Sequence, residues 1–376
     1  MKKRSLFTML VAAALLLSTF VPGLAEDVIK IGGIGVLSGK YGMYGLAVKE
    51  GVDLYVKQVN AAGGVMGKQV EVYWEDTQGN ASEAINAYFK LSEQGMVAYI
   101  GAVLSGESKA LAEVTAEDGA PQISPSATDY DVTTGRPNVF RTCFLDPFQA
   151  KAMADFIANE GLKSVAVLYD NSNDYSLGLF EAFKAQSEKN GLSVVAAESA
   201  AFGDTDYKTQ LTTIMNAKPE AVFLPYYGAD AALILAQANE LGLNAKFFGA
   251  DGIADIVELI SDKNLLTSLI YTDHFSEGAQ SEAAQKFVAD YQAEYGKLPS
   301  ISFSATGYDA AQVLLNAIEA AGSTEPDAIV AAIKATNSTV VSGNITFDDH
   351  NDPVKSIFFQ TFDSEGNKQF ILQVDP

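Results

Sequence analysis

The chain has 376 residues, of which 47 are acidic and 25 are basic, so its formal net charge is −22. This acidic excess argues against nucleic acid as a partner, because phosphate backbones bind clusters of Lys and Arg. The single cysteine, Cys143, excludes an intramolecular disulfide, and the length allows two hydrophobic cores.

The first 25 residues have the pattern of a secretory signal peptide. Basic residues at 2–4 precede an apolar stretch at 6–21, and small residues favour cleavage before Glu26. A membrane anchor needs roughly 20 apolar residues, which is more than this run provides. No cysteine near the cleavage point could carry a lipid. We therefore expect a soluble protein exported to the periplasm or another extracytoplasmic space.

Strand patterns then alternate with amphipathic helix patterns, which indicates parallel sheets covered on both faces. The first run predicts strands at 28–37, 70–75, 97–101 and 122–124 and helices at 45–61, 82–93 and 106–118. After Pro147 the pattern restarts with a helix to residue 159. It continues with strands at 165–169, 194–197, 221–224 and 246–249 and helices at 177–190, 207–217 and 230–241.

The two runs correspond in pattern and spacing, which predicts two similar doubly wound α/β lobes with a hinge near residues 141–147. Later patterns predict strands at 269–272, 356–362 and 369–374 and helices at 281–295, 302–321 and 327–335. Some of these must return to the first lobe, so the hinge should contain several strands. We expect residues 26–145 with 275–350 in the N-terminal lobe and 146–274 with 351–376 in the C-terminal lobe. Such a pair of lobes closes around a ligand.

Residues typical of enzymes and metal sites are few. The chain has two histidines, no Gly-x-Ser-x-Gly nucleophile loop and no metal-ligand spacing of His or Cys. The glycines at 33–35 fall inside a strand pattern, which argues against a dinucleotide loop. The acidic residues at 348–352 favour an exposed turn with acidic caps. We therefore expect no catalysis, no cofactor and no resident metal, and Cys143 should be a small buried residue.

Hydroxylated residues follow two neighbouring predicted strands, at Ser105 and at Ser126–Thr128, where hydroxyl and N–H groups suit an anion. At equivalent strand ends of the second lobe lie Tyr175, Tyr227 and Asp251. An anion site facing a carboxylate suits a zwitterion, which describes an α-amino acid. Helix capping is the alternative for Ser126, Thr128 and Asp251.

Several stretches resemble the periplasmic Leu/Ile/Val-binding proteins, the type I binding proteins of ABC importers. They include Asn-Ala-Ala-Gly-Gly-Val-Met-Gly at 60–67, Ile-Ser-Pro-Ser-Ala-Thr at 123–128 and Gly-Ala-Asp-Gly at 249–252. The resemblance covers essentially the whole mature chain and implies the type I periplasmic binding protein fold.

The resemblance also implies roles for individual residues. Ser105 and Thr128 would hold a ligand carboxylate with main-chain help at Ser126, while Thr128, the Ser126 carbonyl and Asp251 would hold the ammonium. Tyr175 would contribute from the second lobe, and we group Ala127 with these residues. The wall around the ligand side chain would consist of Tyr44, Leu104, Tyr227 and Phe303.

Two departures from the family pattern concern the site. The family's founding members have a disulfide whose positions match Gln78 and Leu104, and their ammonium-binding acid is a glutamate where this chain has Asp251. The shorter acid would draw the ligand toward the second lobe or require a bridging water.

We expect a monomeric solute-binding protein that delivers an aliphatic or small neutral amino acid, of branched-chain type, to an ABC permease. The alternatives are another small carboxylate or amide as ligand, a sensory ligand-binding role and, remotely, an enzyme.

Overall fold

The short apolar runs of the N-terminal part form one parallel sheet. The structure is a computed structural model, and it describes residues 28–201 and 203–375. The strand order of this sheet is β2-β1-β3-β4-β5, and all neighbours are parallel. The strands are β1 (Ile29–Gly35), β2 (Val70–Asp76), β3 (Ala98–Gly101), β4 (Gln122–Ser124) and β5 (Val139–Arg141). β3 and β4 are buried throughout, as expected of central parallel strands.

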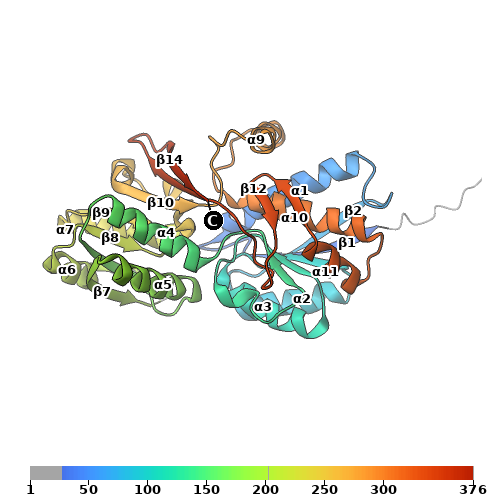
Figure 1. Cartoon of the computed structure of the whole chain (residues 1–376), viewed down its shortest axis with the longest axis horizontal. Coiled ribbons are helices and arrows are strands. Elements are labelled where there is room, and N and C mark those ends of the chain that lie inside the picture. Colours follow the sequence, from blue (N-terminus) through green and yellow to red (C-terminus); the bar gives the residue numbers. More distant parts are fainter. Residues whose placement is uncertain (1–27, 202, 376) are drawn as a thin grey trace, which may run out of the picture.

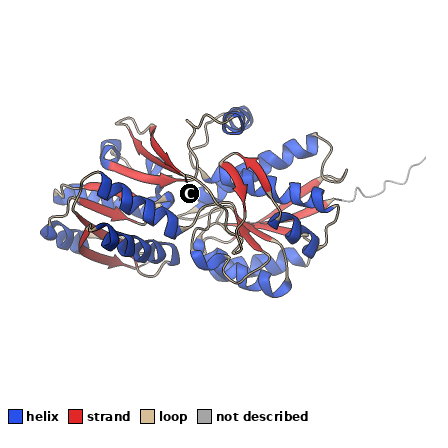
Figure 2. Cartoon of the chain, viewed as in Figure 1, coloured by secondary structure: helices blue, strands red, loops and turns tan. Residues whose placement is uncertain are grey.

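Helices connect these strands and lie on both faces of the sheet (Figure 2). They are α1 (Gly42–Ala61), α2 (Ala81–Ser92), α3 (Ser105–Asp118) and the short 3-10 helix η1 (Tyr130–Val132). Asn80 caps α2 because its side chain accepts hydrogen bonds from the N–H groups of Ser82 and Glu83. Gly119 ends α3 in the left-handed conformation, with a φ of 68°.

The second lobe contains a seven-stranded sheet with the order β14-β13-β10-β9-β8-β6-β7. Its parallel strands are β6 (Ser164–Asp170), β7 (Ser193–Ala200), β8 (Ala221–Leu224), β9 (Lys246–Gly249) and β10 (Leu269–Asp273). Antiparallel neighbours β13 (Ile357–Phe362) and β14 (Lys368–Val374) complete it. The helices are α4 (Asp146–Asn159), α5 (Asp174–Asn190), α6 (Lys208–Ala217), α7 (Gly228–Leu241), η2 (Asp251–Ile253), α8 (Ile256–Leu259) and η3 (Lys263–Ser268).

The chain returns to the first lobe before it ends in the second (Figure 1). The returning elements are α9 (Glu282–Tyr295), α10 (Phe303–Ala321), α11 (Pro326–Lys334) and the hairpin of β11 (Asn337–Val340) and β12 (Gly343–Thr346). α10 packs closely against α1. A Cβ atom at Gly51 would lie 1.9 Å from the Ser304 carbonyl oxygen, and one at Gly307 would lie 2.6 Å from the Val48 carbonyl oxygen. Glycine at these positions is therefore what allows the two helices to touch.

The predicted class of two α/β lobes with a multi-strand hinge is confirmed. The chain crosses between the lobes three times, between β5 and α4, between β10 and α9, and between β12 and β13. The first and third crossings are joined by a buried ion pair, in which Arg141 Nε lies 2.7 Å from Asp352 Oδ1. Asp352 also accepts a hydrogen bond from the Thr133 hydroxyl (2.7 Å).

The expectation of an exposed turn at residues 348–352 is wrong for its second half. Asn351 and Asp352 are each only 3% exposed. The Asn351 amide donates to the carbonyls of Arg136, Pro137 and Val139, which draws this end of the turn into the first lobe.

Two further expectations concern Cys143 and membrane-spanning segments. Cys143 is a buried free thiol, as expected. Among residues 28–201 and 203–375, no helix is long and apolar enough to cross a bilayer. The predicted signal peptide at residues 1–25 lies outside the described residues.

Replacement of Asp352 by alanine should destabilise the protein by about 3 kcal/mol, because it leaves the buried Arg141 guanidinium without its counter-charge. Urea denaturation measures the loss. The control is Glu240→Ala, which removes an exposed ion pair with Lys208 and should leave the denaturation midpoint close to that of the parent. Equal losses in the two variants would contradict a structural role for the buried pair.

Candidate functional site

Two loops of the first lobe bring small hydroxylated residues together at one edge of the sheet. β3 and β4 are parallel neighbours, so the loops that carry Ser105 and Ser126–Thr128 leave the sheet side by side. The Ser126 hydroxyl donates to the Val103 carbonyl (2.8 Å), and the Asp129 N–H donates to Ser105 Oγ (3.3 Å). These bonds join the two loops into one surface.

The main chain of Ala127 is fixed by its own lobe. Its N–H donates to Ser124 Oγ (3.1 Å), and its carbonyl accepts from Arg141 Nη1 (2.7 Å). The hydroxyl of the next residue, Thr128, is buried and lacks a partner with good hydrogen-bond geometry among the described residues. The main-chain groups of Ala127 are therefore already bonded within the lobe, whereas the Thr128 hydroxyl is available to a ligand.

Glu107 shapes the turn that places Ser105. Its Oε1 accepts from the N–H groups of Val103 (3.1 Å) and Leu104 (2.9 Å), and its Oε2 accepts from the Thr77 hydroxyl. Burial raises the pKa of Glu107 to about 7, although these hydrogen bonds favour the ionised form. The turn that carries Ser105 is therefore held by an acid with a pKa near neutrality. Glu107 was not predicted as a site residue, although a glutamate two positions into a predicted helix is a capping signal.

Tyr175 and Asp251, predicted to face these loops from the second lobe, are in direct contact. Tyr175 lies in the first turn of α5, which follows β6, and Asp251 directly follows β9 and Ala250. The Tyr175 hydroxyl donates to Asp251 Oδ1 (3.0 Å) and accepts from the Gly252 N–H (2.7 Å). The carboxyl ends of two strands of the second sheet are therefore linked at this point.

Two residues absent from the sequence-predicted site also hold Asp251. Gln149 Nε2 donates to Asp251 Oδ1 (2.7 Å), and His274 Nε2 lies 3.0 Å from Oδ2. Asp251 is 1% exposed, and among the described residues the one group that could pair with it as a cation is His274, when that ring is protonated. The position of His274 directly after a predicted strand was the signal that could have placed it at this edge.

Asp146 is a second buried carboxyl close to Asp251. Its Oδ1 accepts from the same Gln149 amide (2.8 Å), whereas its Oδ2 has no hydrogen-bond partner among the described residues. Burial and the nearby charge of Asp251 raise the pKa of Asp146 well above its ordinary value. The Asp146 N–H donates to the Thr128 carbonyl (2.9 Å), so this acid connects the first-lobe loop to the second-lobe carboxylate.

The remaining predicted residues form an aromatic wall between the lobes. Tyr227 stacks on Tyr175 with ring centroids 4.9 Å apart, and Tyr44 lies 5.7 Å from Tyr227 and 5.5 Å from Phe303. Leu104 is buried in the same cluster. Tyr41, which was not predicted, has its ring centroid 4.9 Å from that of Tyr227. A surface of this composition suits an apolar group.

Tyr44 also connects the lobes by hydrogen bonds. Its hydroxyl lies 2.7 Å from the Gly252 carbonyl oxygen and 2.6 Å from Asp255 Oδ1, and it accepts from the Gly228 N–H (2.9 Å). One phenolic proton cannot serve two acceptors, so a protonated Asp255 would donate to Tyr44 instead. This agrees with burial raising the pKa of Asp255 to about 7. The lobes are therefore held closed by contacts beside the site.

Comparisons with known proteins place this geometry in context. The family model described as periplasmic binding protein matches residues 28–367. Leu/Ile/Val-binding protein homolog 3 of Brucella melitensis is 31% identical over 305 residues, which are 81% of this chain and 82% of the relative.

Solved structures are similar over nearly the whole chain. The leucine-binding protein LivK of Thermotoga maritima has a TM-score of 0.86 at 34% identity, covering 93% of this chain and 99% of its own. The branched-chain amino acid binding protein LivJ of Streptococcus pneumoniae, solved with isoleucine, has a TM-score of 0.86 at 29% identity, covering 93% and 100%.

The buried acid Glu107 should make the protein less stable as the pH rises. Its pKa is about 7 when folded and 4.5 ordinarily, so between these values the folded state binds more protons than the unfolded state and the free energy of unfolding falls with pH. Glu107→Gln keeps an acceptor for both N–H groups and should remove up to roughly 3 kcal/mol of this fall. Urea denaturation of the ligand-free protein from pH 4.5 to 7.5 measures it.

The control for this experiment is Glu117→Gln, on the exposed side of the same helix, which should keep the pH profile of the parent. If Glu107→Gln and the parent lost the same stability across this range, Glu107 would not be the titrating group.

Proposed function

Because this chain belongs to the periplasmic binding protein family, we propose that it is an exported solute-binding protein of an ABC importer. Its two lobes close around a neutral aliphatic α-amino acid, of branched-chain type, and the closed form delivers the amino acid to a membrane permease. The observation that carries this proposal is the buried pair of Tyr175 and Asp251, linked through Gln149 and Asp146 to the loop of Thr128.

The charges of the site favour a zwitterion in one orientation. The hydroxyls of Ser105 and Thr128 and the main chain at Ser126 would receive the carboxylate. Asp251 would receive the ammonium. A carboxylate offers about four acceptor positions. Since Asp251 Oδ1 has two partners and Oδ2 has one, a position remains for a ligand N–H.

The aromatic wall would contact the ligand side chain. Tyr44, Tyr227, Phe303 and Leu104 are buried and mostly apolar, and the Tyr44 hydroxyl already has protein partners, so an aliphatic group would be preferred to a charged one. The relatives support this class of ligand. A Pseudomonas aeruginosa relative at 28% identity is named a leucine-, isoleucine-, valine-, threonine- and alanine-binding protein, and the similar LivJ structure contains isoleucine.

The family is one of binding proteins and not of enzymes, in agreement with the expectation from the sequence. We extend the proposal to export and assembly: residues 1–25 are removed as a signal peptide, the mature protein is periplasmic or otherwise extracytoplasmic, and it acts as a monomer.

Replacement of Asp251 by alanine should weaken binding of leucine, isoleucine and valine by about 2–5 kcal/mol, because the ligand ammonium would be buried without a counter-charge. Isothermal titration calorimetry measures the affinity. The matched ligand is 4-methylpentanoate, which has the leucine side chain and carboxylate but no ammonium. The parent should strongly prefer leucine to 4-methylpentanoate, and Asp251→Ala should lose most of that preference.

Two results would overturn this proposal. One is an unchanged leucine affinity in Asp251→Ala, which would remove the assigned ammonium site. The other is a parent protein that binds 4-methylpentanoate or benzoate but no amino acid, which would replace the zwitterion by a simple carboxylate.

A further inference from the structure

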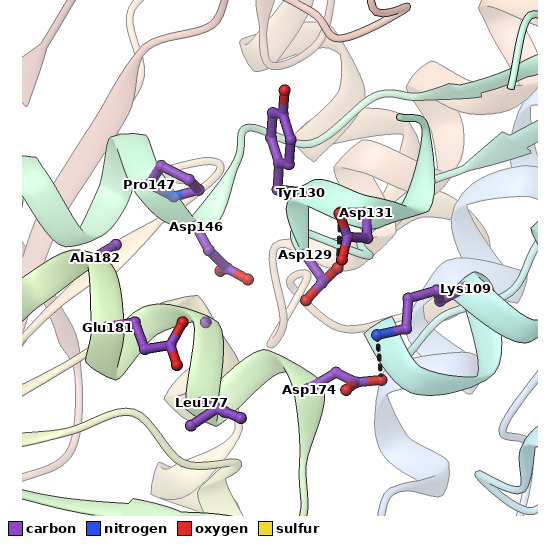
Figure 3. A pocket seen from close by; sticks show the side chains of 11 residues that line it. Lys109, Asp129, Tyr130, Asp131, Asp146, Pro147, Asp174, Leu177, Glu181 and Ala182 are labelled. Atoms are coloured by element: carbon purple, nitrogen blue, oxygen red, sulfur yellow. Dashed lines mark hydrogen bonds and ion pairs between the residues drawn. The ribbon is translucent and has the colours of Figure 1, made fainter. Parts of the chain in front are cut away.

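A cavity of about 380 Å³ opens between the lobes beside Asp146. Its walls come from α3 and η1 of the first lobe and from the first turns of α4 and α5 of the second (Figure 3). The ionisable residues that line it are Lys109, Asp129, Asp131, Asp146, Asp174 and Glu181. Asp251 does not line this cavity, so it is separate from the proposed amino-acid site, and Asp146 stands between the two.

The charge of the cavity is strongly negative. Lys109 is the one basic residue among the described residues that line it, and it already pairs with Asp174 across the lobes at 2.9 Å. The charge of Lys109 also acts on Asp129 and Asp131, and none of the other four carboxyl groups forms an ion pair with a basic residue of the cavity. In Figure 3 the side chains of Asp129, Asp146 and Glu181 are directed toward the same space.

Two carboxylate oxygens, one from each lobe, converge over Gly178. A Cβ atom at Gly178 would lie 3.6 Å from Asp129 Oδ2 and 4.0 Å from Asp146 Oδ2. Asp146 is 1% exposed, and this Oδ2 has no hydrogen-bond partner among the described residues. A buried carboxyl oxygen without a partner is costly, and a donor that carries a positive charge would satisfy it best.

We propose that this cavity is a second binding site, for a small aliphatic amine or diamine cation whose ammonium group bridges Asp129 and Asp146. The volume leaves room for a short hydrocarbon chain beside the ammonium, and the cavity also contains apolar and aromatic side chains that suit one: Tyr130, Pro147, Leu177 and Ala182. A metal ion fits less well, because the described part of the chain holds no group of three or more ligating side chains arranged for one.

Such a cation would act on closure of the lobes. Asp129 belongs to the first lobe and Asp146 begins the first helix of the second, so an ammonium that contacts both oxygens would bridge the two lobes. A ligand that binds the closed form better shifts the equilibrium toward it and tightens every other ligand of that form. The amine would therefore raise the affinity for the amino acid, although the amine site itself does not depend on which amino acid binds.

The test uses the mature protein with n-butylammonium chloride and 1,4-diammoniobutane dichloride as probes. Sodium chloride at equal ionic strength is the reference, and calcium chloride tests a metal. Calorimetry and thermal denaturation should show saturable binding of at least one amine. Two variants should weaken that binding at least tenfold: Asp146→Asn, which replaces the carboxyl group by an amide that cannot ionise, and Gly178→Ala, which places a methyl group where the two oxygens converge. Glu117→Gln, outside the cavity, should bind the amine as the parent does.

Gly178→Ala also separates this proposal from the proposed function. A methyl group there makes only ordinary contacts in the structure, so the variant should fold with a melting temperature near that of the parent and keep its leucine affinity. Loss of amine binding with leucine binding intact is the expected result. The amine site is refuted if the parent shows no saturable amine binding, if all variants bind the amine equally, or if calcium ions replace the amines at low concentration.

Discussion

The carboxyl edge of the second sheet is organised around one buried acidic side chain, that of Asp251. Asp251 is held by Gln149 from α4, by Tyr175 from α5 and by His274 from the segment after β10. Gln149 and Tyr175 are neutral donors that orient the carboxyl group without cancelling a negative charge on it, and a buried charge without a counter-charge costs several kcal/mol. A ligand ammonium, as proposed above, would supply that counter-charge.

Local sequence patterns predicted the fold and several residues of the candidate site. Ser105, Thr128, Tyr175 and Asp251 were identifiable because each follows a short apolar run, and polar groups at the carboxyl ends of parallel strands meet at one edge. Gln149 and Glu107 were not predicted as site residues. Both lie in helical patterns, and such a pattern does not indicate which distant groups a side chain will contact. Gln149 is separated from Asp251 by 102 residues, and no periodicity reports a contact of that range.

The Arg141 side chain contacts both the hinge and the loop at Ser126–Thr128. Arg141 begins the first crossing between the lobes, pairs with Asp352 on the third, and donates to the carbonyls of Ala127 and Asp129 in the loop. Burial of Asp352 was not foreseeable from an acidic turn, because its partner is supplied by a distant strand. The arrangement couples the position of the hinge to the geometry of the loop that we propose binds the ligand carboxylate.

The contact between α1 and α10 has a consequence for selectivity. Tyr44 lies in the first turn of α1 and Phe303 begins α10, and the two helices touch at Gly51 and Gly307 without room for a single additional methyl group. Neither helix can slide or rotate alone, so the rings of Tyr44 and Phe303 should keep a fixed position relative to each other. The aromatic wall would then discriminate among amino acids by its fixed shape, and it would not adapt to each ligand side chain.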